Sequence, residues 1–269
     1  MLIKNRGNSL YLKRLELSNF RNYRSLKLEL KPGLNMFIGT NAQGKTNLLE
    51  SIYFLSCGSS YRTADNKEAN FIVVMFSPQD LDIVRSSPVY RRQFLDRILN
   101  QINPEYRHHF ERHQRILNQR NSLLKLFHLT GNRKKIVNTI DLWNRLFVTS
   151  GSFIIMERIK LLEILNNLAK GVIDKIPING KLEICYSTSM SVEKKDKIKD
   201  IEDEMLRKLK ERQKRDISIG VTTIGPHRYD IKITIGGRDA RHYGSGGQQR
   251  MKSKISTYLV ENGKIKVWQ

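Results

Sequence analysis

The sequence is poor in cysteine, in long hydrophobic runs and in acidic side chains. Only Cys57 and Cys185 occur among its 269 residues, too few for a disulfide framework or a thiolate zinc site. No apolar run approaches the ~20 residues that a membrane-spanning helix needs. Residues 1–9 contain no apolar segment typical of a secretory signal. These absences favour a protein of the reducing cytoplasm that does not enter a membrane.

The shortage of acidic residues leaves a large positive charge. Lysine and arginine number 48 against 26 aspartates and glutamates, a formal net charge of +22. Such an excess repels itself unless a polyanion shares the surface. We therefore expect nucleic acid as the partner, bound in a strongly salt-dependent way. General surface basicity, as in some lysine-rich thermophile proteins, is the alternative.

A glycine-rich segment near the N-terminus carries the strongest motif. Residues 39–46 read GTNAQGKT, the spacing of a P-loop, and they stand between an apolar segment and a helical pattern as a P-loop requires. Glycines let consecutive amides turn toward an anion, and the following helix directs its positive end to the same place. Lys45 would neutralise the β- and γ-phosphates of a nucleotide, and the Thr46 hydroxyl would bind Mg²⁺. The expected nucleotide-binding residues here are Gly39, Thr40, Asn41, Ala42, Gln43, Gly44, Lys45, Thr46 and Asn47.

Hydrophobic periodicity predicts the surrounding elements. Residues 11–20 and 25–30 alternate as two strands of a hairpin with a turn at 21–23, and a third strand over 34–38 enters the P-loop. A helix follows to about residue 57. Residues 71–76 form a continuous apolar run typical of a buried strand.

The middle of the chain has helical spacing from about residue 84 to 171. Short breaks divide it into three helices that we expect to pack antiparallel. Beyond them we expect a strand over 181–187, an amphipathic helix over 191–215, a return to strand over 217–223, and a strand and turn over 229–237.

Basic residues interleave with the apolar positions of these helices, and they predict a track for DNA phosphates. A solvated helix face is the alternative for each single residue. His108, His109 and His113 lack the spacing of a zinc motif. The candidate DNA-binding residues are Arg91, Arg92, Arg112, Arg115, Arg133, Lys134 and Lys135.

Two stretches of the chain carry a family resemblance. The run from Leu12 to Tyr61, with SNFRNY at 18–23 and the P-loop at 39–50, resembles the RecF family of bacterial recombinational-repair ATPases, relatives of the SMC and Rad50 heads. The turn at 245–250, SGGQQR, resembles the signature motif of ABC ATPases. Residues 225–230, GPHRYD, resemble the family's Gly-Pro-His-Arg-Asp-Asp motif with Tyr229 in place of the first Asp, and their role is left open.

The resemblance implies an α/β fold: a P-loop NTPase of the ABC/SMC-head type, with a mixed sheet, N-terminal antiparallel strands and a helical second lobe. The implied segments are residues 11–83 and 216–269 for the two halves of the ATPase lobe, 84–175 for the helical lobe, and 176–215 for a strand and charged helix.

The resemblance also assigns roles around the nucleotide, which would be ATP with Mg²⁺. Arg21 would reach the phosphates from the hairpin turn, a solvated turn arginine being the alternative. By position Gln79 resembles the residue that meets the metal and the attacking water. The signature loop of one subunit would complete the P-loop site of another, so that ATP holds a head-to-head homodimer together. The signature residues concerned are Ser245, Gly246, Gly247 and Gln248.

Family members act in DNA replication, recombination and the SOS response. The resemblance therefore implies binding to gapped DNA or to single-strand/duplex junctions, RecO and RecR as partners, and help in loading the recombinase.

Two parts of the family pattern are missing. After the signature, Lys254 passes straight to Ile255 and a segment like the family's closing strand, without the acid pair, D-loop and switch histidine that serve hydrolysis. Further strands are lacking near 68–71. Either separated segments run together here or the chain is a shortened relative. We expect ATP binding and leave hydrolysis open. The alternatives are a non-hydrolysing ATP-binding scaffold and an SMC/Rad50-type head fragment, although residues 191–215 are far too short for coiled-coil arms.

Overall fold

The computed structural model describes residues 2–6, 9–56, 83–84, 86–130, 137–173, 180–190 and 197–242. The chain divides into two compact units, residues 1–80 with 256–269, and residues 81–255. In the described ranges no helix is long and apolar enough to cross a membrane.

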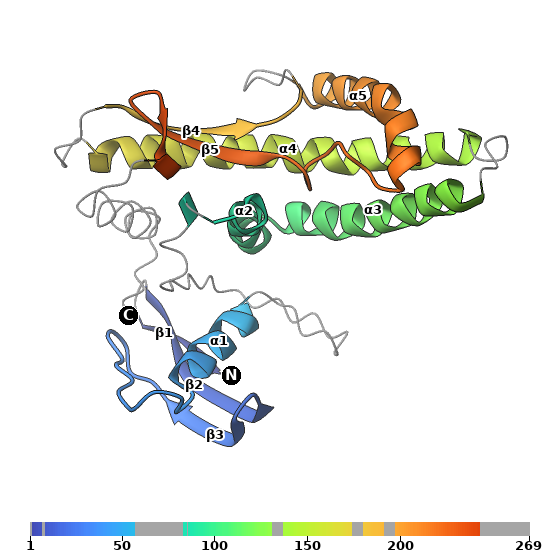
Figure 1. Cartoon of the computed structure of the whole chain (residues 1–269). Helices are drawn as coiled ribbons and strands as arrows, with labels where there is room; N and C mark the ends of the chain where they lie inside the picture. The colour runs from blue at the N-terminus through green and yellow to red at the C-terminus, as the bar shows by residue number, and fades with distance from the viewer. Residues whose placement is uncertain are drawn as a thin grey trace. The chain divides into compact units, whose positions relative to one another are not determined.

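The described residues of the first unit form a three-stranded antiparallel sheet and one helix (Figure 1). Leu15 pairs with Leu28 and Leu17 with Leu26, so these side chains share one face because neighbours along a strand point to opposite faces. That face packs against Leu48 of the helix. The expected hairpin and helix are confirmed. The elements are β1 (Leu2–Arg6), β2 (Ser9–Phe20), β3 (Tyr23–Glu29) and α1 (Lys45–Ser56).

The segment before the P-loop differs from expectation. Residues 34–38 have no regular secondary structure, so the expected third strand is wrong. Phe37 packs against the apolar face of the sheet, whereas Met36 is 71% and Ile38 86% exposed. An extended segment becomes a strand only by pairing its backbone with a neighbour, and sequence periodicity cannot report that pairing.

The second unit begins with the three expected helices, α2 (Pro88–Ile102), α3 (Pro104–Thr130) and α4 (Val137–Ile173). Pro88 stands in the first turn of α2, where a missing amide costs nothing. Asn103 ends α2, and its side-chain oxygen accepts the Tyr106 amide at 3.1 Å, which caps α3. Figure 1 shows α3 and α4 side by side. The predicted helices are confirmed.

Helix α5 (Ile198–Ile219) packs on α4, and the Met205 side chain of α5 lies against Gly151 of α4. A Cβ at Gly151 of α4 would lie 2.7 Å from Met205 Cε and 3.1 Å from His113 Cε1, so a larger residue there would require the Met205 side chain to shift. Helix α5 runs through the expected strand at 217–223 and ends where Gly220 takes a φ of 71°. The expected strand is therefore wrong.

A second sheet in the order β4-β5-β6 lies on the same unit. Its strands are β4 (Leu182–Ser187), β5 (Asp230–Ile235) and β6 (Arg238–Asp239), all antiparallel, followed by the 3-10 turn η2 (Ala240–His242). Because β5 pairs with β4, the described part of 216–269 belongs to the second unit, whereas we expected that range in the ATPase lobe.

The Asn166 side chain of α4 forms hydrogen bonds with the outer edge of β4. The Asn166 amide donates to the Ile184 carbonyl, and its oxygen accepts the Ile184 N–H at 2.7 Å. One side chain thus satisfies both backbone groups of an edge-strand residue.

Candidate functional site

The turn between β2 and β3 has an unusual backbone. Asn19 and Arg21 have positive φ angles of 50° and 52°, in the left-handed region that few non-glycine residues adopt. The pairing of Phe20 with Tyr23 closes the hairpin, with Asn19 just before the pair and Arg21 within the turn. Strained residues of this kind concentrate where a chain binds a ligand.

The P-loop has the backbone that an anion site needs. Ala42 (φ 66°) and Gly44 (φ 92°) are both left-handed, and α1 begins at Lys45. The first amides of a helix have no acceptor within it and attract negative charge. Lys45 Nζ donates to the carbonyls of Gly39 and Thr40 at 2.8 and 2.7 Å. The lysine charge therefore lies over the loop.

The hairpin turn and the P-loop are in direct contact. Tyr23 donates its hydroxyl to the Gly44 carbonyl at 3.1 Å, and Asn47 donates its amide to Asn22 Oδ1 at 2.8 Å. A Cβ at Gly44 would lie 2.4 Å from Asn22 Nδ2, so any larger residue there would force the Asn22 side chain to move. The motif pattern did not reveal the roles of Asn22 and Tyr23.

Arg21 extends from the same turn to helix α1. Its Nη2 lies 2.8 Å from Glu50 Oε1, and both side chains are well exposed. The hydrogen bond to Glu50, and then its charge, raise the pKa of Arg21. The Glu50 carboxylate thus holds Arg21 beside helix α1, which the P-loop enters.

These residues can bind a polyphosphate. Glycine-loop amides, the Lys45 ammonium and the end of α1 converge, and the exposed Thr46 can offer its hydroxyl to a metal bound by phosphate oxygens. The described residues include no group of three or more His, Cys, Asp and Glu suited to a metal ion by itself. Gln79 and the signature residues Ser245, Gly246, Gly247 and Gln248 lie outside the described residues, as do Arg133, Lys134 and Lys135.

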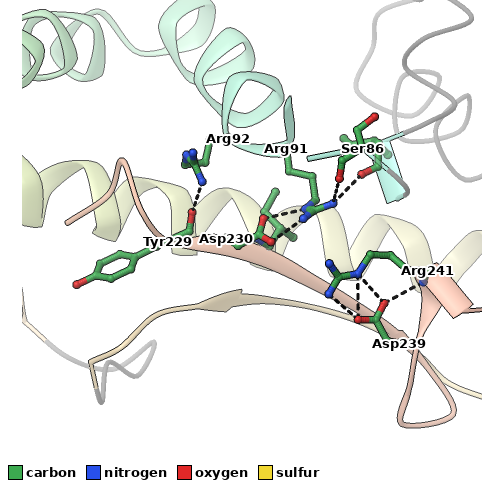
Figure 2. A network of polar contacts seen from close by, with 9 residues as sticks. Ser86, Arg91, Arg92, Tyr229, Asp230, Asp239 and Arg241 are labelled. Carbon is green, nitrogen blue, oxygen red and sulfur yellow. Dashed lines mark hydrogen bonds and ion pairs between the residues drawn. The ribbon is translucent and has the colours of Figure 1, made fainter. Parts of the chain in front are cut away.

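The candidate DNA-binding arginines of the second unit differ in their exposure. Arg91 is 2% exposed and forms a fork on Asp230, Nε to Oδ1 at 2.8 Å and Nη2 to Oδ2 at 2.6 Å (Figure 2). It also donates to the Ser86 carbonyl. Arg91 is therefore a structural residue, and the expectation that it contacts DNA is wrong. Arg112 and Arg115 of α3 are exposed and accessible.

Arg92 lies at the same junction but is partly exposed. Its Nη1 donates to the Tyr229 carbonyl at 3.0 Å (Figure 2). Burial, and then the nearby charge of Arg158, lower the pKa of Arg92. Among the described residues no carboxylate forms an ion pair with it.

The segment GPHRYD at 225–230 meets a buried arginine that motif analysis missed. Arg158 of α4 donates to the Pro226 carbonyl at 2.7 Å and to the Tyr186 hydroxyl at 2.9 Å, and it forms a fork on Asp96. Tyr106 donates its hydroxyl to the same carboxylate at 2.6 Å. The signal was available in the sequence, since Arg158 is a lone charge among Ile154, Ile155, Leu161 and Leu162 at helical spacing.

Known proteins are similar to most of this chain. A family model described as an AAA ATPase domain matches residues 10–264. The DNA replication and repair protein RecF of Clostridium novyi (strain NT) is 35% identical over 295 residues, covering 90% of this chain and 78% of the relative. The RecF of Lysinibacillus sphaericus (strain C3-41) is 33% identical over 310 residues, with 96% and 82% covered. Both lengths exceed the 269 residues of this chain, so the relatives carry residues within the matched range that it lacks.

Two solved structures are similar as well. The recombination mediator protein RecF with ATPrS, of the RecFOR pathway, has a TM-score of 0.82 and 30% identity over 94% of this chain and 81% of that one. The same protein with ATP has a TM-score of 0.81 and 29% identity over 93% and 80%. The expected fold class, an α/β P-loop NTPase of the ABC/SMC-head type with a helical lobe, is confirmed.

Proposed function

This chain belongs to the RecF family of DNA replication and repair proteins, and from that premise we propose that it is an ATP-dependent DNA-binding protein of recombinational repair. ATP would join two copies head to head on gapped DNA or at a single-strand/duplex junction, and the assembly would help to load the recombinase. The observation that carries the proposal is the P-loop with Lys45 over it and the hairpin turn packed against Gly44.

The nucleotide would be bound by residues of the first unit. Gly39–Thr46 would surround the phosphates, Asn47 would support the loop, and Arg21 would move from Glu50 to a phosphate oxygen. Thr46 and Gln79 would hold Mg²⁺, which neutralises charge on the transferred phosphate when bound. The signature residues Ser245–Gln248 of a second copy would close the site. The match to RecF solved with ATP supports this proposal.

The DNA would lie on basic residues of the second unit. Arg92, Arg112 and Arg115 are accessible in it, and Arg133, Lys134 and Lys135 extend the same series in sequence. The net charge of +22 supports a polyanionic ligand. RecO- and RecR-type proteins would be the partners, as the RecFOR pathway of the similar structures suggests.

A second candidate function follows from a specific observation. The sequence after the signature lacks the acid pair that positions Mg²⁺ and water in this family. An ATP-binding scaffold that does not hydrolyse ATP would still dimerise on DNA but would not release it by turnover. Measured ATP turnover separates the two functions.

Sedimentation of the full chain tests the proposal. We expect dimers with ATP, monomers with ADP or without nucleotide, and a larger complex when gapped DNA is added to the ATP form. Lys45→Met should abolish the ATP-dependent dimer. Lys27→Met, which removes an exposed lysine of β3 from the same unit, is the matched control. Dimerisation that persists in Lys45→Met would remove the P-loop from the mechanism.

A further inference from the structure

Arg91 ties together the place where the chain enters the second unit, which begins at residue 81. Its Nη1 donates back to the Ser86 carbonyl at 2.5 Å and, more weakly, to the Ile83 carbonyl at 3.5 Å. Its Nε and Nη2 form the fork on Asp230 (Figure 2). Burial would raise the pKa of Asp230, but the hydrogen bond from Arg91 outweighs it and the pKa is lowered. The first residues of the second unit and helix α2 are thus joined to the start of β5.

Two other ion pairs of a buried arginine and an aspartate have different neighbours. Arg120 and Asp216 join α3 to α5, and Arg158 and Asp96 join α4 to α2. The remaining partners of these two arginines lie in α3, α4, β4 and the segment 222–226. Among these three pairs of the described chain, that of Arg91 alone reaches the segment that follows the boundary at residue 81.

Strand β5 leads from this fork toward the signature residues in the sequence. Asp230 is its first residue, and β6 and η2 follow its far end. There the Arg241 side chain binds Asp239, with Nη2 2.7 Å from Oδ2 (Figure 2). The hydrogen bond to Asp239, and then its charge, raise the pKa of Arg241, and the charge of Asp230 adds to the same shift. Ser245 stands four residues further along the chain. The fork therefore lies between two stretches of chain, one that comes from the first unit and one that leads to the signature.

The proposed dimer needs a different contribution from each unit. The P-loop at 39–46 belongs to the first unit, and the signature residues 245–248 fall in the range of the second. Binding of the nucleotide by one chain thus uses the first unit, whereas closure of the site uses the second unit of another copy. Groups that close such a site must be held within about 0.5 Å of their productive geometry.

We propose that Arg91 and Asp230 are positioning residues for the ATP-dependent dimer, an inference that rests on the proposed function. A guanidinium and a carboxylate joined by two parallel bonds fix both the distance and the angle between their backbones. The fork thereby holds the entry to the second unit and strand β5 in one mutual placement. The signature of one copy then meets the nucleotide of the other.

Arg91→Lys tests this inference, because lysine keeps the positive charge but cannot form the fork. We expect unchanged affinity for a fluorescent ATP analogue, titrated at protein concentrations where the wild type is monomeric, since the P-loop lies in the first unit. The dissociation constant of the dimer formed with ATP, measured by sedimentation, should rise by about tenfold or more, because small misplacements in a site have large effects.

Arg120→Lys is the matched control, since it makes the same change in a buried arginine that pairs with Asp216 elsewhere in the unit. Thermal unfolding followed by circular dichroism should show a loss of stability in both variants, and only Arg91→Lys should weaken the dimer. Asp230→Asn removes the charge from the other side of the fork and should weaken the dimer too. This second variant keeps the test valid if Arg91→Lys does not fold.

The wild type separates the failure of this inference from that of the proposed function. A wild type without an ATP-dependent dimer would overturn the proposed function, and the inference with it. Where the wild type does dimerise, equal weakening in Arg91→Lys and Arg120→Lys would overturn the inference alone, because a general loss of stability would then explain the effect. An unchanged dimer in Arg91→Lys and Asp230→Asn would overturn it as well.

Discussion

Arg120 of α3 and Asp216 of α5 form a completely buried ion pair, with Nη1 3.1 Å from Oδ2 and neither side chain exposed. Arg120 also donates to Asn144 and Thr222, at 2.9 and 2.6 Å. Asp216 accepts the amide and hydroxyl of Thr223 through its other oxygen. The pair thus joins three helices and the segment that leads into residues 225–230. Burial lowers the pKa of Arg120, and the charge of Asp216 opposes that shift.

Asp216→Asn should destabilise the protein strongly. The substitution leaves the Arg120 charge buried without a counter-charge, which costs on the order of 3–5 kcal/mol. Chemical denaturation followed by circular dichroism measures the loss. Glu211→Gln, which removes an exposed partner of Arg207, is the control and should cost about 0.5 kcal/mol or less. A small loss in Asp216→Asn would mean that water reaches the arginine.

Gly44→Ala should weaken nucleotide binding more than backbone strain explains. Gly44 and Gly33 both have a φ of 92°, but a Cβ would meet Asn22 only at Gly44, and at Gly33 it would meet nothing within 4 Å. Left-handed alanine costs about 1–2 kcal/mol at either position. Gly33→Ala is the matched control. Titration with a fluorescent ATP analogue should show weaker binding for Gly44→Ala and unchanged binding for Gly33→Ala. Equal affinities in the two variants would show that the contact between Asn22 and the loop is unimportant for binding.

Acid should destabilise the second unit through its buried histidines. Burial lowers the pKa of His227 to about 4, against about 6.5 when unfolded. Between these values the unfolded chain takes up a proton that the folded chain refuses, so the free energy of unfolding falls as the pH falls. The slope approaches about 1.4 kcal/mol per pH unit for this residue. Unfolding midpoints at pH 7.5, 6.5, 5.5 and 4.5 measure it. His227→Gln should flatten the profile, and an unchanged slope in that variant would assign the effect elsewhere.

Arg112→Gln combined with Arg115→Gln should reduce DNA affinity and its salt dependence together. Each lost contact with a duplex phosphate lowers the slope of log K against log salt by about 0.9, so the double variant should lose about 2. Fluorescence anisotropy with gapped DNA at several salt concentrations measures this. The control is Lys199→Gln with Lys208→Gln on α5, where both lysines have acidic partners. Identical slopes in both double variants would place the DNA on another surface.

The sequence was sufficient where a motif or a periodicity is local. The spacing of GTNAQGKT located the loop, and the apolar spacing located α2, α3 and α4 with only small differences at their ends. The contact of Asn22 with Gly44 was not predictable, because it depends on how a turn 22 residues earlier packs against the loop. The strand expected at 34–38 is absent for a similar reason: a strand requires backbone pairing with a neighbouring strand, and the sequence of one segment does not show that pairing.

Helical spacing contains a signal for the burial of three arginines. Arg91 stands four residues before Leu95, Arg120 four before Leu124, and Arg158 four after Ile154, so each occupies the apolar face of its helix. All three are buried and bound to carboxylates. Arg112 also stands four residues before a buried residue, Ile116, but its other helical neighbours His108 and Arg115 are exposed, and Arg112 is exposed with them. An arginine on an apolar face therefore predicts a buried ion pair better than it predicts contact with DNA.

The amide of Asn166 has a consequence for how molecules of this protein can associate. An open strand edge invites another chain to extend the sheet, which is a route to fibres. At the middle of β4 an incoming strand would find both the N–H and the carbonyl of Ile184 already taken. Another strand could pair with the main chain at the middle of this edge only by displacing the Asn166 amide, so this side chain acts as a guard against uncontrolled sheet extension.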